Sequence, residues 1–137
     1  MNKILEIKDL AKNFYTTEGE VKAIENISLE VYDQEFLCIV GSSGCGKSTL
    51  LNIIAYLDQP TSGSFKYFKD KPTIGYMLQE DALLPWLTIL DNALLGLEIK
   101  GIKTKDNILY TKSLLETYGL KEFMNKYPDQ LSGGMKQ

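Results

Sequence analysis

Residues 36–49 read FLCIVGSSGCGKST, and this stretch decides the fold of the chain. Residues 36–40 form a continuous apolar run, which is typical of a strand covered on both faces in a parallel sheet. A glycine-rich run follows. Residues 47–57 are rich in apolar side chains and are closed by Pro60 and Gly63, so they predict a helix. The stretch therefore predicts a strand, a glycine-rich loop and a helix in succession.

The loop matches the pattern G-x-x-x-x-G-K-S, and its place between a strand and a helix is the context in which this pattern binds phosphate. Glycines let the backbone fold around an anion, and the helix start adds unpaired N–H donors. Lys47 is predicted to contact the β- and γ-phosphates, Ser48 to bind Mg²⁺ and Thr49 to donate toward the α-phosphate. The alternative is a glycine-rich turn that binds nothing. The predicted loop residues are Gly41, Ser42, Ser43, Gly44, Cys45, Gly46, Lys47, Ser48 and Thr49.

The composition is that of an ordinary globular domain, with 137 residues, 44% hydrophobic content and a formal net charge of −3. This charge gives no overall basic field to recruit nucleic acid. Histidine is absent, which removes the commonest general acid or base. Cys38 is predicted to fill the core, and Cys45 to serve as a small loop residue. No signal peptide or membrane span is visible, so a cytoplasmic location is expected.

The rest of the chain changes character near residue 79. Strands are expected at residues 4–8, 27–31, 64–68 and 74–78, whereas residues 88–99 and 104–118 have helical patterns. In the second helix Ile108, Leu115 and Tyr118 share one stripe. The fold class is therefore α/β, with a partial strand-rich nucleotide-binding core at 1–87 and a helical subdomain at 88–137.

The chain ends Leu131-Ser132-Gly133-Gly134-Met135-Lys136-Gln137, which resembles the signature sequence of ATP-binding-cassette (ABC) ATPases. The resemblance implies a P-loop NTPase core with an antiparallel β edge and an α-helical subdomain. It implies that Ser132 caps a short helix and that Gly133 and Gly134 expose backbone donors to ATP bound by a second copy of the domain. The expected partner is therefore a homodimer mate. A capped helix start after a loop is the alternative.

Two further sites follow from the resemblance. The run Gly75-Tyr76-Met77-Leu78-Gln79-Glu80-Asp81 is similar to the family's Q-loop, which implies that Gln79 orients Mg²⁺ and the attacking water. The family also places an aromatic residue upstream of the phosphate loop, and Phe14 stands at that position. Phe14 would stack on adenine, although Tyr15 could take this role and either ring could be a surface or core aromatic.

The run Leu83-Leu84-Pro85-Trp86 resembles importers of the nitrate, sulfonate and taurine type. The family docks its membrane permease just after the Q-loop glutamine, so residues 79–91 are the expected permease contact. Trp86 is a candidate anchor for it, and a buried core tryptophan is the alternative. This contact would hold the chain at the inner face of the cell membrane.

The resemblance also implies parts that this sequence does not contain. The family's domain continues beyond the signature to a strand ending in Asp-Glu and to a switch histidine, so the chain is expected to be incomplete and to lack the C-terminal half. It is expected to bind ATP and Mg²⁺ but not to hydrolyse ATP, because Gln79 cannot serve as a general base. Without those strands, the edges of the central strand would be uncovered and would favour aggregation, so the isolated chain is expected to be marginally stable or poorly ordered.

Two departures from the family pattern stand out. Gln34-Glu35 replaces the usual Gly-Glu, so the turn there is expected to differ in type. The segment between Gly63 and Gln79 looks short, which predicts a trimmed hairpin.

The leading hypothesis is the ATP-binding, energy-coupling subunit of an importer for nitrate-, sulfonate- or taurine-like small solutes. One alternative is a non-catalytic remnant that binds nucleotide or a permease without turnover. The other is a non-transport ABC ATPase, which usually lacks the Leu-Leu-Pro-Trp run.

Overall fold

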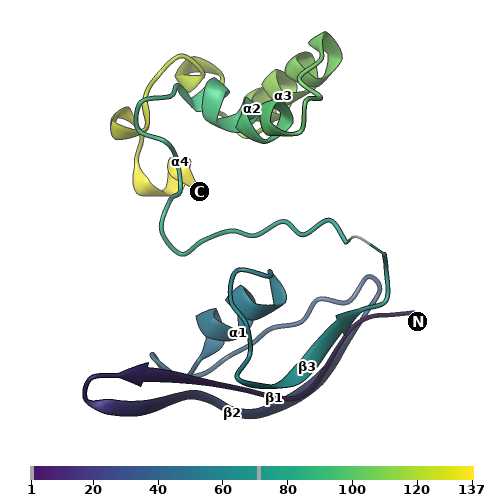
Figure 1. The fold of residues 1–137 in the computed structure, drawn as a ribbon. Coiled ribbons are helices and arrows are strands. Elements are labelled where there is room, and N and C mark those ends of the chain that lie inside the picture. Colours follow the sequence, from purple (N-terminus) through teal and green to yellow (C-terminus); the bar gives the residue numbers. More distant parts are fainter. Residues whose placement is uncertain (1, 71) are drawn as a thin grey trace. The chain divides into compact units, whose positions relative to one another are not determined.

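The computed structural model describes residues 2–70 and 72–137 (Figure 1). The chain folds as two compact units, Met1–Tyr76 and Met77–Gln137, and each is described by itself. The first unit contains all three strands and one helix, and the second contains helices and turns. Residues 77–87 belong to the second unit, whereas the division expected from the sequence lies after residue 87.

The sheet of the first unit is antiparallel, with strand order β2-β1-β3. Strands β1 (Lys3–Thr16) and β2 (Gly19–Tyr32) form a long hairpin, and β3 (Ser62–Tyr67) pairs with the other edge of β1. The strands expected at 4–8, 27–31 and 64–68 are therefore confirmed, although β1 and β2 are much longer than expected. Strand β1 is the central strand, with hydrogen-bonded neighbours on both edges.

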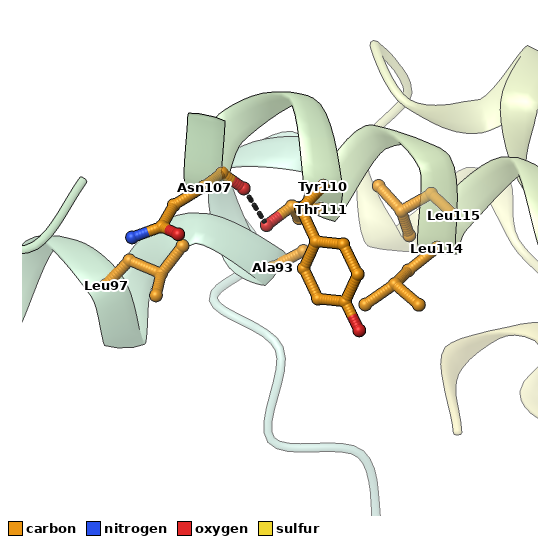
Figure 2. A pocket seen from close by; sticks show the side chains of 7 residues that line it. All are labelled: Ala93, Leu97, Asn107, Tyr110, Thr111, Leu114 and Leu115. Carbon is orange, nitrogen blue, oxygen red and sulfur yellow. Dashed lines mark hydrogen bonds between the residues drawn. The ribbon is translucent and has the colours of Figure 1, made fainter. Parts of the chain in front are cut away.

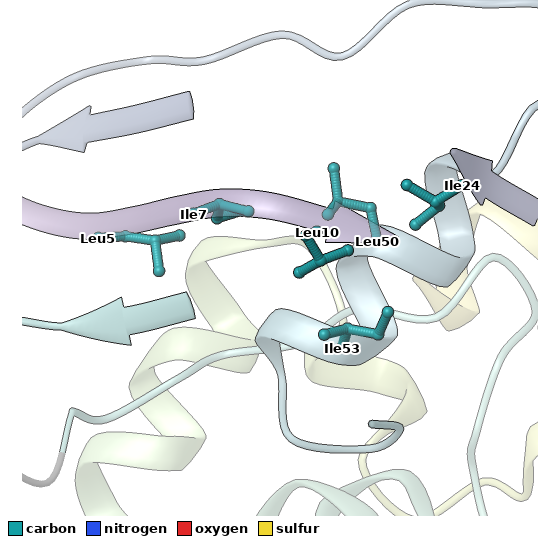
Figure 3. Close-up of a cluster of buried hydrophobic side chains, with 6 residues drawn as sticks. All are labelled: Leu5, Ile7, Leu10, Ile24, Leu50 and Ile53. Carbon is teal, nitrogen blue, oxygen red and sulfur yellow. The ribbon is translucent and has the colours of Figure 1, made fainter. Parts of the chain in front are cut away.

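Helix α1 (Lys47–Ile54) packs its buried side against this sheet. Its two buried residues, Leu50 and Ile53, are three positions apart and so lie on one helical face. They meet the buried side chains of the sheet, and the six residues form one core (Figure 3). The members of this core are Leu5, Ile7, Leu10, Ile24, Leu50 and Ile53.

A bulge in β1 keeps that core continuous. Asp9 has a left-handed φ of 46°, and the pairing with both neighbours shifts between residues 7 and 11. Because strand side chains alternate, this shift is what allows Leu10 to be buried on the same face as Leu5 and Ile7. Gly63 lies against the bulge, where a Cβ would be only 2.2 Å from the Asp9 carbonyl oxygen.

The strand expected at residues 36–40 is wrong. This segment has no regular secondary structure, and Phe36 and Val40 are 95% and 84% exposed. Cys38 is exposed too, so the expectation that it fills the core is also wrong. A strand needs a neighbour for its backbone N–H and C=O groups, and the three strands of this sheet pair only with one another. Apolar composition alone therefore does not make residues 36–40 a strand.

Three other expectations change. Residues 74–78 form no strand, so the trimmed hairpin expected between Gly63 and Gln79 is not formed. Strand β3 pairs with β1 instead. The turn at Gln34-Glu35 is expected to differ because Gln replaces the usual Gly, yet Gln34 adopts the left-handed φ of 62° that favours glycine. The Glu35 carboxylate accepts a hydrogen bond from the Tyr32 amide at 2.7 Å within this turn. Tyr118 is 77% exposed and does not belong to a buried stripe.

The second unit confirms the two expected helices. Helix α2 (Ile89–Ile99) and helix α3 (Lys105–Thr117) begin at Thr88 and Thr104, whose hydroxyls accept a backbone N–H in the first turn. Gly119 follows α3 with a left-handed φ of 76°, as expected at a helix end. Two 3₁₀ turns (Lys121–Phe123 and Pro128–Gln130) lead to the short helix α4 (Gly133–Lys136). Within residues 2–70 and 72–137, no helix has both the length and the apolar composition needed to cross a membrane.

Candidate functional site

The glycine-rich loop runs directly into helix α1. Gly44 and Gly46 have φ values of 79° and 93°, a region that favours glycine. Gly46 also lies against strand β2, because a Cβ there would be 2.3 Å from the Ala23 carbonyl oxygen and 3.1 Å from Ile24 Cγ1. The sheet therefore supports the point where the loop becomes a helix, and only glycine fits there without a shift of the backbone.

The first turn of α1 leaves its backbone donors open. No side chain caps the helix, and the first helical hydrogen bond runs from the Leu50 amide to the Gly46 carbonyl at 2.9 Å. In the described part of the chain, the amides of Lys47, Ser48 and Thr49 therefore have no acceptor. Three converging N–H groups at the positive end of a helix dipole form a site suited to an anion.

Lys47 folds back across the loop that precedes it. Its Nζ donates to the carbonyl oxygens of Gly41 at 2.9 Å and Ser42 at 2.6 Å, and it lies 3.5 Å from Cys45 Sγ. The ammonium thus stands at the mouth of the loop and adds a full positive charge to the open amides. Ser48 is exposed on the same first turn, and Ser43 and Thr49 complete the run. The structure thus brings together the residues that the motif predicts for phosphate binding.

Phe14 lies on β1 and is 41% exposed. The Lys12 ammonium stands 5.0 Å from the centre of the Phe14 ring, and it also binds the Asp58 carboxylate at 2.6 Å, just beyond the end of α1. The hydrogen bond from Lys12 lowers the pKa of Asp58, and the backbone N–H of Gln59 lowers it further. Adjacent strand residues point to opposite faces, and the neighbouring Tyr15 is 76% exposed. Phe14 and Tyr15 therefore lie on opposite faces of the sheet.

Gln79 lies in the second unit, beside the signature residues. An open pocket of about 520 Å³ is lined by Gln79, Glu80, Asp81, Gly133 and Gln137. The Gln79 carbonyl accepts a hydrogen bond from Gln137 Nε2 at 3.3 Å, and Lys136 Nζ lies 3.7 Å from Asp81 Oδ2. Sequence reasoning did not pair these two segments, because 58 positions separate Gln79 from Gln137.

The signature segment has the expected backbone but not the expected cap. Ser132 occupies the N-cap position of α4, yet its side chain makes no capping hydrogen bond. Helix α4 has only four residues, and Gly133 and Gly134 are exposed at its start. The donors of this segment are therefore accessible.

A magnesium ion would find few protein ligands at the phosphate loop. Among the residues that the structure describes, no group of three or more His, Cys, Asp or Glu side chains is arranged to hold a metal ion. The first turn of α1 contains no acidic residue, and its side-chain oxygens are the hydroxyls of the exposed Ser48 and the half-buried Thr49. This fits Mg²⁺, which usually keeps several waters and binds through few protein groups plus substrate phosphates.

The second unit contains two further features. Trp86 is 69% exposed, as a docking anchor requires, so the alternative of a core tryptophan is wrong. An apolar pocket of about 330 Å³ lies between α2 and α3, lined by Leu97, Tyr110, Leu114 and their neighbours (Figure 2). The Thr111 hydroxyl donates to the Asn107 carbonyl at 2.8 Å, and Asn107 Nδ2 donates to the Ile102 carbonyl at 2.7 Å. Because these polar groups are already paired, the pocket resembles a packing groove more than a polar ligand site.

Comparisons with known proteins agree with the motifs. The model of the family described as ABC transporter matches residues 24–137. An uncharacterised ABC transporter ATP-binding protein of Methanocaldococcus jannaschii is 45% identical over 97% of this chain and 52% of its own length. A nitrate import ATP-binding protein of Synechocystis is 41% identical over 97% of this chain and 52% of its own length.

A solved structure shares the fold as well. It is a dimeric post-hydrolysis state of an ATP-binding cassette bound to ADP and Pi, with a TM-score of 0.82 and 33% identity. The match covers 97% of this chain and 65% of that one, and the chain spans about half the length of the curated relatives it matches. The α/β fold with an antiparallel sheet is thus that of an ABC ATPase cassette, and the chain belongs to the ABC transporter family.

Proposed function

We propose that this chain is the ATP-binding part of an ABC importer's energy-coupling subunit. The observation that carries the proposal is the start of helix α1, where the first three amides have no acceptor among the described residues and the Lys47 ammonium reaches back over the preceding loop. A nucleoside triphosphate supplies the negative charge and the acceptor oxygens that the start of helix α1 lacks. Its phosphates would replace the two loop carbonyls that Lys47 contacts now.

Each further residue has a defined role in this proposal. Phe14 stacks on adenine, Ser48 holds the metal through its hydroxyl, and the Gln79 side chain orients the metal and the attacking water. Bound Mg²⁺ would neutralise charge on the phosphates. A carboxamide cannot accept the proton of the attacking water, so we propose that residues 1–137 bind ATP without turning it over.

The proposed partners are a second copy of the domain and a membrane permease. Ser132, Gly133 and Gly134 present exposed donors for the nucleotide of the second copy, and the similar solved cassette is dimeric. The permease would dock on residues 79–91, where Trp86 is exposed, and this contact would place the chain at the inner face of the membrane. The Leu83-Leu84-Pro85-Trp86 run and the nitrate-import relative favour an importer of nitrate-, sulfonate- or taurine-like or related small solutes.

The principal alternative is a remnant that binds nucleotide or a permease without ever contributing to turnover. The same open helix start would serve this alternative, because binding a nucleotide there does not require turnover. Turnover by the full-length protein together with its permease would exclude this alternative.

The test of nucleotide binding is a fluorescence titration of the chain with an ATP analogue in the presence of Mg²⁺. Lys47→Ala removes a charged donor and should weaken binding by about 10- to 100-fold. Ser132→Ala is the control, because Ser132 would contact the nucleotide of a second copy and should leave binding to the monomer nearly unchanged. Equal losses in both variants would contradict the two-site assignment, and no binding by the unmodified chain would refute the proposal.

A further inference from the structure

Tyr76, within the run that is similar to the Q-loop, is hydrogen-bonded to the phosphate-loop helix. The Tyr76 hydroxyl donates to Asn52 Oδ1 of α1 at 2.5 Å, and both side chains are half-buried. Residues 72–78 have no regular secondary structure, so no strand pairing holds this segment. The side-chain hydrogen bond therefore helps to fix the point at which the segment leaves the first unit.

The two partners lie close to functional positions in the sequence. Asn52 follows Ser48 by four residues on α1, so the two side chains share one helical face. Tyr76 precedes Gln79 by three residues, and an extended chain spans at most about 11 Å over three residues. Fixing Tyr76 on α1 therefore restricts the volume that Gln79 can reach.

We propose that Tyr76 and Asn52 are a positioning pair that sets the approach of Gln79 to the nucleotide's metal ion. Neither side chain touches the nucleotide; they act by fixing the point from which the chain continues to Gln79. This inference rests on the proposed function, in which Ser48 and Gln79 serve Mg·ATP. It predicts that loss of the hydroxyl weakens only the part of binding that depends on the metal.

A second tyrosine provides a matched control. The Tyr67 hydroxyl donates to the Ile54 carbonyl of the same helix at 2.8 Å, and Tyr67 is also half-buried. Tyr67 lies on β3, however, and does not lead directly into Gln79. Tyr67→Phe thus removes a comparable hydrogen bond to α1 without releasing the Q-loop segment.

The experiment compares the affinity for a fluorescent ATP analogue in Mg²⁺ and in EDTA. Tyr76→Phe should lower the affinity in Mg²⁺ by about five-fold, the effect of losing one net hydrogen bond, and leave the affinity in EDTA unchanged. Asn52→Ala should have the same metal-specific effect, and the double variant should lose no more than either single variant. Gln79→Ala should reproduce the pattern, whereas Tyr67→Phe should change the two affinities by the same factor.

The outcomes separate this inference from the proposed function. If the unmodified chain binds and Gln79→Ala is metal-specific, but Tyr76→Phe changes both affinities equally or neither, the positioning pair is wrong and the ATP site stands. If the unmodified chain binds in neither condition, the proposed function fails and the positioning pair fails with it. Circular dichroism of each variant checks that the fold is retained.

Discussion

Helices α1 and α2 begin in opposite ways. At the start of α2, the amides of Ile89 and Leu90 donate to two carbonyls of residues 124–126, at 2.9 and 3.0 Å. The amide of Asp91 donates to the Thr88 hydroxyl at 3.1 Å. The amides of the first three residues of α2 thus all have acceptors within the second unit.

Helix α1 has no such acceptors within residues 2–70 and 72–137. A protein gains stability by satisfying these donors, as Thr88 does for α2, so an open helix start is a local cost. The comparison shows that the start of α2 is completed by acceptors of its own unit, whereas the start of α1 keeps donors that the proposed nucleotide could use. The same unit that carries the open start also carries the glycine-rich loop and Lys47.

The opposite end of α1 is held by side chains from elsewhere in the first unit. The Tyr67 hydroxyl donates to the Ile54 carbonyl, and Lys12 binds Asp58 just after the helix. Tyr76 adds the hydrogen bond to Asn52. Helix α1 is therefore fixed from its C-terminal half, which leaves its N-terminal amides free without leaving the helix loose.

The largest expected effect comes from Gly46→Ala, which alters the open start itself. The new Cβ would be 2.3 Å from the Ala23 carbonyl oxygen, at a residue whose φ is 93°. Strain and the enforced backbone shift should lower the free energy of unfolding by about 2–4 kcal/mol. Urea denaturation followed by circular dichroism measures this loss, and nucleotide binding should fall with it.

Gly44→Ala is the matched control for that variant. Gly44 also has a left-handed φ, of 79°, but a Cβ there meets no atom within 4 Å. Only the conformational cost remains, about 1–2 kcal/mol. Equal destabilisation by both substitutions would show that the contact between Gly46 and β2 contributes nothing.

A smaller effect is expected from Thr88→Ala, which opens the start of α2. Loss of the cap should lower the free energy of unfolding by about 1 kcal/mol, whereas Thr88→Ser should retain most of it. Trp86 is the single tryptophan of the chain and lies two positions away, so its fluorescence during urea denaturation reports the second unit. ATP affinity should stay unchanged, and a drop in affinity at unchanged stability would contradict the distinction between the two helices.

The sequence predicted the phosphate loop because its information is local. The glycines at fixed positions, the lysine and the start of the following helix all lie within residues 41–49, and the structure places them together. The caps of α2 and α3 were likewise within reach, since a threonine just before a helical pattern is a short-range signal. Trp86 could be expected at the surface only from its resemblance to importer sequences.

Residues 36–40 show where such reasoning fails. Their apolar run resembles that of a buried strand, yet β1 is paired on both edges while this segment has no partner. Hydrophobicity indicates that a segment favours burial, but a strand also depends on backbone partners that can lie anywhere in the chain. The same holds for Tyr76 and Asn52 and for Gln79 and Gln137, whose hydrogen bonds join residues 24 and 58 positions apart.

The smallest expected effect concerns the ion pair between Lys12 and Asp58, just beyond the C-terminal end of α1, and appears as a pH dependence of stability. Asp58 accepts a hydrogen bond from Lys12 at 2.6 Å, and this bond, followed by that of the Gln59 amide, lowers the pKa of Asp58 below 3.8. As the pH falls below that value, the unfolded chain takes up a proton that the folded chain still excludes, so stability falls with the pH. The contribution of Asp58 is therefore complete above pH 3.8 and is lost as the pH falls through the lowered pKa.

Urea midpoints of the unmodified chain and of Asp58→Asn should differ by a constant amount near neutral pH and converge in acid. Glu6, whose pKa is lowered to about 2 mainly by its hydrogen bond to Lys3, is present in both proteins, so the comparison isolates Asp58. A difference that stays constant into strong acid would mean that Lys12 and Asp58 do not stabilise α1 as an ion pair.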